Sequence, residues 1–329
     1  MGGSFDLPAC RLGLGLAAVG RPAYITLGRE RDLGTDRSAE AMYARASAVL
    51  DAAWRAGVRY VDAARSYGRA EEFLARWMDE RAIPCGELVV GSKWGYRYTA
   101  GWRMDAAEHE HKELSLERFR SQLAESKALL GDRLALYQIH SATLESGCLD
   151  DQRLLAALVE ARERGAYGGI GLTLTGDGSR ATLERALEAR VGGTRVFDAV
   201  QATFNLLEPS IAGGLRAAAA AGLRVIAKEV FANGRLTPAN DRPSDAPLAA
   251  TLAGVAKRAG MAVDQLAAAW VLAHPFVHVT LSGAATPAQV ASHAGALDRA
   301  IPEECMDELA RLAEPPARYW KERASLPWA

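Results

Sequence analysis

The sequence predicts an α/β protein built as a single (β/α)8 barrel, the architecture known as a TIM barrel. Three observations favour this fold class: strand-like apolar runs recur eight times, helical patterns lie between them, and 329 residues suffice for eight such units. The runs cover residues 12–17, 58–64, 88–94, 134–140, 167–173, 197–203, 223–229 and 278–284. We expect one domain over residues 1–329, because α/β barrels routinely exceed the usual domain size.

The segments between these runs carry the start and stop signals of helices. Ser115 precedes a helical stretch that Gly131 terminates, and Gly165 terminates the next one. The alanine-rich run at 217–221 is expected to form a further helix, since alanine has the highest helix propensity. The apolar faces of the first two helices consist of Leu116, Phe119, Leu123 and Leu130 and of Leu154, Leu155, Leu158 and Val159.

An open, doubly wound sheet is the alternative arrangement of alternating strands and helices. Such sheets bind dinucleotides at a GxGxxG sequence that follows the first strand and opens a helix. In this chain Gly13-Leu14-Gly15 lacks the third glycine and a following helical pattern. The closed barrel is therefore the preferred fold.

Three segments fit the repeating pattern poorly, namely 18–38, 96–114 and the tail from 314. We expect them to form rim loops, with the tail over the mouth of the barrel. They are rich in aromatic side chains, from which ligand pockets are often built, although the same side chains could simply cover the barrel. The residues expected to contact substrate are Trp94, Tyr96, Trp102 and Trp320.

Composition excludes several classes of partner. The formal net charge is -1, so no overall positive field attracts nucleic acid or an anionic membrane. The four cysteines are scattered without a CxxC pair, which fits reduced thiols. The N-terminus lacks a basic segment followed by an apolar core, and no run reaches transmembrane length. We expect a cytoplasmic protein that acts on a small molecule, and the oligomeric state stays open.

Four ionisable residues stand where predicted strands give way to loops. Asp62 lies near the end of the second run and Tyr67 follows that run, Lys93 lies at the end of the third and His140 ends the fourth. In a parallel barrel these strand ends face one mouth, so the four side chains are expected to converge. A cation beside a tyrosine lowers the pKa of the phenol, which makes the phenol a better acid near neutral pH. Singly, each residue could instead cap a turn, pack at the rim or lie solvated.

The order and context of these residues resemble the aldo-keto reductase superfamily. The resemblance rests on Asp62 with Tyr67 five residues later, on Ser92-Lys93-Trp94, on Tyr137-Gln138-Ile139-His140 and on the segment 201–207. It implies that Tyr67 is the general acid that protonates a carbonyl oxygen while a nicotinamide supplies hydride. Lys93, held by Asp62, would tune that tyrosine, and His140 would orient the carbonyl. The same site could run in reverse as an alcohol dehydrogenase.

The resemblance also implies a site for NADPH or NADH. Its expected contacts are Thr173, Gln201, Lys228, Gly234, Arg235, Ser282, Gly283, Gln289 and His293. Three positions depart from the family pattern: Leu174 replaces an asparagine, Lys228 replaces a stacking aromatic residue, and the stretch 281–290 has no basic side chain for a 2′-phosphate. The choice between NADPH and NADH therefore stays open.

Two classes of enzyme and one class of non-enzyme remain. The preferred prediction is a nicotinamide-dependent oxidoreductase that reduces an aldehyde or ketone, or oxidises an alcohol. The alternative is a redox-neutral isomerase, lyase or cyclase on the same barrel with an altered or lost cofactor site. A regulatory protein with a vestigial site is the third possibility, and the intact set of four residues argues against it. His109-Glu110-His111 lacks a third ligand at a recognised spacing, so we predict no metal site.

Overall fold

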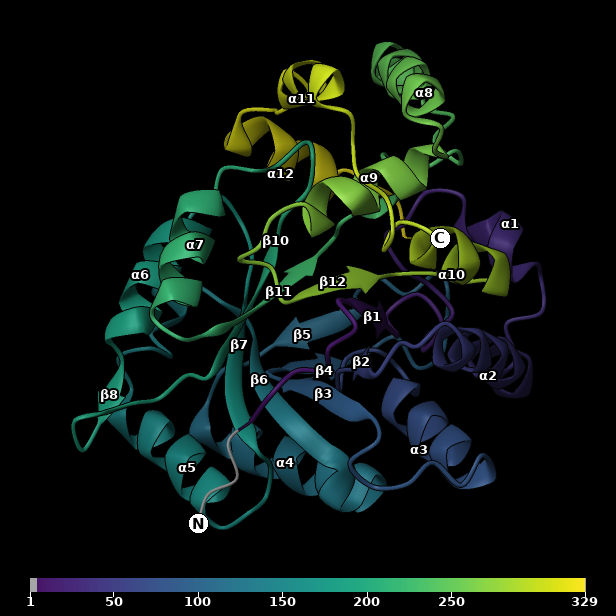
Figure 1. Cartoon of the computed structure of the whole chain (residues 1–329). Helices are drawn as coiled ribbons and strands as arrows, with labels where there is room; N and C mark the ends of the chain where they lie inside the picture. The colour runs from purple at the N-terminus through teal and green to yellow at the C-terminus, as the bar shows by residue number, and fades with distance from the viewer. Residues whose placement is uncertain (1–4, 329) are drawn as a thin grey trace.

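The computed structural model describes residues 5–328 and contains a closed barrel of eight parallel strands. The strands follow one another around the barrel in the order β1-β12-β11-β10-β7-β6-β3-β2. Figure 1 shows them at the centre of the molecule with helices around them. The predicted (β/α)8 fold is thus confirmed. The strand bounds are Leu12–Gly15 (β1), Tyr60–Asp62 (β2), Val89–Trp94 (β3), Leu134–Ala142 (β6), Gly169–Leu174 (β7), Ala199–Thr203 (β10), Arg224–Lys228 (β11) and Val279–Ser282 (β12).

Three of the helices begin at residues whose side chains cap them, and one of these residues, Ser115, is the start that the sequence predicted. Ser38, Ser115 and Asp151 each accept a hydrogen bond from a backbone N–H of the first turn, which satisfies groups that a helix start leaves unpaired. Gly131 ends α4 with a φ of 58°. The α-helices are Arg29–Leu33 (α1), Ala39–Arg55 (α2), Ala70–Glu80 (α3), Leu116–Leu130 (α4), Gln152–Glu163 (α5), Ser179–Glu188 (α6), Ala212–Ala220 (α7), Ala246–Ala259 (α8), Val263–Leu272 (α9), Pro287–Ala294 (α10), Glu303–Ala310 (α11) and Pro316–Ala324 (α12).

Apolar side chains form two separate clusters. The larger cluster lies between the barrel and its helices. The smaller one consists of Tyr60, Leu136, Ala199, Ile226, Val279 and Leu281, with Phe5 and Leu7 packed against it. Since β2, β6 and β10 are not neighbours in the sheet, their side chains can meet only across the interior of the barrel. The interior is therefore a packed core, and the pocket must lie at its mouth.

All three predicted rim loops contain regular structure, and segment 18–38 includes α1. Segment 96–114 forms an antiparallel hairpin of β4 (Tyr96–Tyr98) and β5 (Glu110–Lys112). The tail contains α12, which begins at Pro316, a favourable first-turn residue. A second hairpin, β8 (Arg190–Val191) with β9 (Thr194–Arg195), turns through Gly192 and Gly193, both with positive φ. In residues 5–328 no helix is both long and apolar enough to span a membrane.

The packed interior makes the stability of the barrel sensitive to small cavities. Leu136→Ala removes a completely buried side chain from the inner cluster, and we expect it to lower the free energy of unfolding by about 3 kcal/mol. Leu144→Ala is the matched control, because the Leu144 side chain is 42% exposed and should change stability by less than about 0.5 kcal/mol. Urea unfolding measures both variants. Equal losses would contradict the placement of Leu136 in a tight core.

Candidate active site

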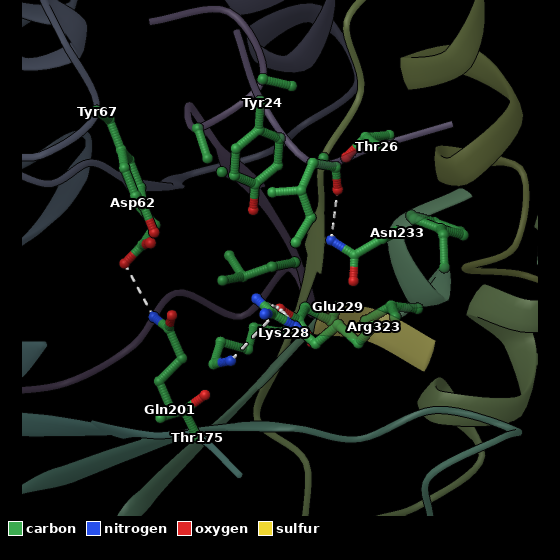
Figure 2. Close-up of a pocket in the computed structure, with 18 of the residues that line it drawn as sticks. Tyr24, Thr26, Asp62, Tyr67, Thr175, Gln201, Lys228, Glu229, Asn233 and Arg323 are labelled. Atoms are coloured by element: carbon green, nitrogen blue, oxygen red, sulfur yellow. Dashed lines mark hydrogen bonds and ion pairs between the residues drawn. The ribbon is translucent and has the colours of Figure 1, made fainter. Parts of the chain in front are cut away.

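Side chains from the ends of three barrel strands meet in one pocket. Asp62 ends β2, Lys93 lies in β3 and His140 lies in β6, while Tyr67 belongs to the turn between β2 and α3. Because the strands are parallel, their carboxyl ends open at the same mouth. Asp62, Tyr67 and His140 line a pocket there, which we call the main pocket, and Figure 2 shows Tyr67 beside Asp62 at its wall. The structure thus agrees with the sequence prediction that these side chains converge at one mouth of the barrel.

The ammonium group of Lys93 connects two of the other three side chains. It donates hydrogen bonds to the carboxylate of Asp62, to the backbone oxygen of Ala63 at 2.9 Å and to the hydroxyl of Tyr67 at 3.2 Å. The side chain of Lys93 is wholly buried and that of Asp62 is 3% exposed. A buried charge requires a partner, so the ion pair holds the ammonium group next to the phenol.

Further donors fix the carboxylate of Asp62. Its Oδ1 atom accepts hydrogen bonds from the hydroxyl of Tyr60 at 3.2 Å, from the amide of Gln138 at 3.1 Å and from the amide of Gln201 at 3.0 Å. Glycine is required at position 91, because a Cβ atom there would lie 2.4 Å from the Tyr60 hydroxyl. Gln201, which the resemblance places at the nicotinamide, lines the main pocket and also supports Asp62.

The hydroxyl group of Tyr67 is held in its protonated form. Burial raises its pKa well above the usual range, the charge of Asp62 raises it further, and Arg21 opposes both. This net direction differs from the lowering that the sequence analysis predicted from Lys93 alone. The ammonium of Lys93 is paired with Asp62, so its attraction for a phenolate is partly cancelled, and burial outweighs the remainder. Tyr67 therefore keeps its proton in the neutral pH range, and formation of its phenolate is costly.

His140 is held neutral at an irregular point of its strand. Burial lowers the pKa of its imidazole well below the usual range, and Lys93 and Lys228 lower it further. The pairing of β6 with β7 shifts register between Ile139 and Ala142, and Ser141 has a φ of 56°. Bulges of this kind re-aim side chains next to functional sites. Among the described residues, His140 Nδ1 is buried and has no hydrogen-bond partner.

A second charged cluster lines the main pocket. Lys228 ends β11, Glu229 follows it, and Arg323 reaches the pocket from α12. The guanidinium of Arg323 donates to Glu229 at 2.8 Å, the hydroxyl of Thr203 donates to Glu229 at 3.0 Å, and Lys228 donates to Thr203 at 2.9 Å. Figure 2 shows Lys228, Glu229 and Arg323 side by side.

The charges of this cluster depend on one another. Burial lowers the pKa of Lys228 to about 8, although Glu229 opposes the shift. Burial alone would raise the pKa of Glu229, but the charges of Arg323 and Lys228 outweigh it and lower that pKa to about 2. The carboxylate thus stays ionised, and the ammonium of Lys228 is the group of this cluster that can lose its proton near neutral pH.

The sequence analysis did not identify Glu229 or Arg323 as site residues. For Glu229 the sequence contained a weak indication, because this residue follows Lys228 at the end of a predicted strand. In the structure the φ of Glu229 is 52°, which is an energetically costly value for a residue with a side chain. For Arg323 the sequence contained no such indication, because 94 residues separate it from Glu229. Helical periodicity also does not reveal which pocket a terminal helix reaches.

Arg21, Tyr24 and Trp328, which were also not predicted, close the mouth of the main pocket. The guanidinium of Arg21 lies 4.9 Å from the ring centroids of both Tyr24 and Trp328 and 5.2 Å from that of Tyr67. It also forms an ion pair with Glu110 of the β4-β5 hairpin at 2.8 Å. The indole of Trp328 stacks on His109 with ring centroids 4.3 Å apart. The hairpin and the tail therefore meet over the pocket, as predicted for the tail.

Of the residues expected to bind substrate, Tyr96 alone lines the main pocket. Trp94 is completely buried against Phe119, and Trp102 donates its indole N–H to the backbone oxygen of Arg37. Trp320 packs against the outer core and carries the guanidinium of Arg323 over its ring. These three tryptophans lie outside the pocket linings: Trp94 on β3 and Trp320 on α12 face the outer core, and Trp102 lies in the turn between β4 and β5.

The residues expected to bind cofactor divide into three groups. Gln201, Lys228, Gly234, Ser282 and Gly283 line the main pocket, and Gln289 and His293 line a neighbouring one. Thr173 is completely buried and accepts a hydrogen bond from the backbone N–H of Ser141, so it supports the bulge of β6. Arg235 forms buried ion pairs with Asp245 and Glu314, which occupy its guanidinium away from both pockets.

The neighbouring cavity, which we call the second pocket, continues the main pocket. The two share the lining residues Ala18, Thr26, Phe231, Gly234 and Gly283. The second pocket reaches α10 through Gln289 and His293. Together the two pockets form an elongated groove from Tyr67 to α10, and we refer to it as the groove.

The groove has the features that an extended dinucleotide requires. A Cβ atom added at Gly283 would meet no other atom within 4 Å, so this glycine leaves open space where both pockets join. Thr286 begins α10 beside this point, and a helix start attracts phosphate groups. Asn233 Oδ1 is buried and has no hydrogen-bond partner among the described residues. These residues fit a nicotinamide dinucleotide. No group of three or more metal-ligating side chains is found in residues 5–328.

Fold and site together define a (β/α)8-barrel protein with a Tyr-Lys-Asp-His set at the carboxyl ends of its strands, in which Lys93 and Asp62 are buried and Tyr67 and His140 are half-buried. The model of the aldo/keto reductase family matches residues 12–314. The chain therefore belongs to the aldo-keto reductase family, and it is an NAD(P)-dependent oxidoreductase.

Two relatives illustrate the similarity. The chain is 29% identical over 252 residues to D-threo-aldose 1-dehydrogenase from a Pseudomonas species, and the match covers 71% of each protein. The holo form of an aldo-keto reductase from Bacillus halodurans superposes with a TM-score of 0.71 at 19% identity, covering 95% of each chain. The second comparison shows a shared fold.

The ion pair between the tail and β11 should contribute to stability. Arg323→Met leaves the buried carboxylate of Glu229 without its strongest partner, and we expect a loss of about 3 kcal/mol in the free energy of unfolding at pH 7. The native pKa of Glu229, about 2, lies below its ordinary value of 4.5. The contribution is therefore complete above pH 4.5 and is lost as the pH falls toward 2.

Urea unfolding at several pH values measures this effect. Arg180→Met is the matched control, because Arg180 pairs with Glu184 on the surface and both side chains are more than half exposed. Its loss should change stability by at most about 0.5 kcal/mol. A loss in Arg323→Met that does not shrink in acid would contradict the role of Glu229.

Proposed function

We propose that the protein interconverts a carbonyl compound and an alcohol at the main pocket, with Tyr67 as the general acid and base. The observation that carries this proposal is the 3.2 Å contact between the ammonium of Lys93 and the hydroxyl of Tyr67 inside a ligand-sized pocket. A phenol next to a fixed cation can give its proton to a carbonyl oxygen, because the cation stabilises the phenolate that forms. The bound nicotinamide supplies or accepts the hydride.

Each member of the set has a separate task in this proposal. Tyr67 moves the proton, Lys93 stabilises the phenolate that forms, and Asp62 holds Lys93 in place. His140 is neutral, so its ring N–H can donate a hydrogen bond to the carbonyl oxygen without competing as an acid. Its ring lies 5.6 Å from that of Tyr67, so both side chains can reach one oxygen atom.

We propose a sugar as the substrate class, with its anomeric carbon as the reacting centre. The name of the Pseudomonas relative, D-threo-aldose 1-dehydrogenase, suggests this class. The lining of the main pocket suits a sugar ring, since Tyr24 and Trp328 offer aromatic faces and Arg21 and Glu110 offer polar groups. Polar groups placed around an aromatic wall can orient a polyhydroxylated ring.

A redox-neutral reaction remains the second candidate because of Lys228. The family resemblance implies an aromatic residue stacked on the nicotinamide at this position, whereas the chain has a lysine whose pKa is about 8. A positive charge there would oppose an oxidised nicotinamide ring. Dependence of turnover on added NAD(P)H separates the two candidates, since a redox-neutral reaction needs none.

Removing the phenolic hydroxyl tests the role of Tyr67 directly. We expect Tyr67→Phe to lower kcat by at least about a hundredfold, because general acid catalysis commonly contributes that much. Binding of NADH should change less than about twofold, since the hydroxyl acts on the substrate. Tyr43→Phe is the control, because the Tyr43 hydroxyl bonds to Glu80 at 2.5 Å, between α2 and α3 and outside both pockets. Full activity in Tyr67→Phe would overturn the assignment.

The raised pKa of Tyr67 predicts different pH profiles in the two directions. Reduction needs the protonated phenol, which is present throughout the neutral range, so its kcat/KM should be flat between about pH 6 and pH 9. Oxidation needs the phenolate, so its kcat/KM should rise about tenfold per pH unit over that range. Lys228→Met removes the other nearby titrating group and should keep the slope. An oxidation profile that levels off near neutral pH would contradict the raised pKa.

A further inference from the structure

The far end of the groove carries a carboxylate that is held in a fixed position. Asp32 of α1 lines the second pocket together with Gln289 of α10. The amide of Gln289 donates to Asp32 Oδ2 at 2.8 Å, and its oxygen accepts the backbone N–H of Ala285 at 2.8 Å. Both the nitrogen and the oxygen of the Gln289 amide are therefore hydrogen-bonded, which fixes the orientation of this side chain. The fixed amide in turn holds the carboxylate of Asp32 at the wall of the second pocket.

The second pocket offers little positive charge to an additional phosphate group. Among the described residues that line the second pocket, the basic side chains are Arg29 and His293. The guanidinium of Arg29 points into the loop and donates to the backbone oxygens of Ala18 at 2.9 Å and Pro22 at 2.7 Å. Asp264 adds a second carboxylate to the wall of the pocket.

His293 does not supply a cation aimed at the pocket. Its Nδ1 atom bonds to the hydroxyl of Ser282 at 2.7 Å, and its Nε2 atom lies 3.5 Å from Asp264. Its ring stacks on Phe231 with centroids 4.0 Å apart. The imidazole is therefore held between these partners.

We propose that Asp32, positioned by Gln289, selects NAD(H) over NADP(H) by binding the adenosine ribose and excluding a 2′-phosphate. This proposal rests on the proposed function, because it needs the nicotinamide end of the dinucleotide at Tyr67. The groove then places the adenosine end in the second pocket, next to α10. Neither the family match nor the named relatives assign the choice of nucleotide.

The chemistry of the two nucleotides differs at the ribose 2′ position. A ribose hydroxyl donates a hydrogen bond to a carboxylate, and dinucleotide-binding folds use an acidic residue for NAD in this way. A 2′-phosphate carries nearly two negative charges, and it would meet Asp32 in a pocket that is partly shielded from water. Recognition of such a phosphate normally requires arginine or lysine, and the segment 281–290 has neither.

Titration of the full-length protein with NADH and with NADPH tests the proposal without any substrate. Quenching of tryptophan fluorescence or calorimetry reports the two dissociation constants for the wild type, for Asp32→Ser and for Glu30→Gln. Glu30 is the matched control, since it lies on the same short helix, carries the same charge, is exposed and does not line either pocket. Circular dichroism and thermal unfolding establish that each variant is folded.

We expect the wild type to bind NADH on the order of tenfold or more tightly than NADPH. Asp32→Ser should reduce this preference on the order of tenfold, chiefly by improving NADPH binding, and Glu30→Gln should leave it within about twofold. Equal or tighter binding of NADPH by the wild type would overturn the proposal, as would an unchanged preference in folded Asp32→Ser. Binding of neither nucleotide by the folded wild type would overturn the proposed function itself.

Should Asp32→Ser fail to fold, Asp32→Asn provides the same comparison. It keeps the size of the side chain and its hydrogen bond with Gln289 while it removes the charge. A preference that persists in full in Asp32→Asn would show that the charge of Asp32 does not select the nucleotide, and a reduced preference would support the proposal.

Discussion

The buried ion pair between Lys93 and Asp62 is the interaction on which the rest of the site depends. Neither charge could stay inside the barrel alone, because an unpaired buried ion costs several kcal/mol. The pair fixes an ammonium group next to the hydroxyl of Tyr67. Tyr60, Gln138 and Gln201 hold the carboxylate from three other directions. The position of the phenol thus follows from hydrogen bonds that begin in the core of the barrel.

The groove, by contrast, is completed by residues far away in the chain. Arg323 and Trp328 come from the C-terminal tail, Glu110 comes from the β4-β5 hairpin, and Arg21 joins the hairpin to the tail. These lining residues therefore lie on connecting segments and a terminal helix outside the barrel strands, which place them around the Tyr-Lys-Asp-His set.

The sequence predicted the barrel and the convergence of four side chains because both follow from local patterns. Apolar runs mark strands, and a polar residue at the end of a parallel strand must face the mouth. The pair of Glu229 with Arg323 and the outward placement of Trp94 were not predicted, because both depend on how distant segments pack. The pKa of Tyr67 was predicted in the wrong direction because the sequence showed the cation but not the degree of burial.

Transfer of deuterium from NADH that carries deuterium at both C4 positions to a carbonyl substrate tests the central claim most directly. Aldoses and simple aldehydes are incubated with the protein and the labelled cofactor, and mass spectrometry of the alcohol product counts the deuterium at the former carbonyl carbon. The barrel, the phenol and the groove predict one deuterium per product molecule and no product without cofactor. A product that forms without the label, or without cofactor, would contradict hydride transfer and indicate redox-neutral chemistry at Tyr67 and Lys93.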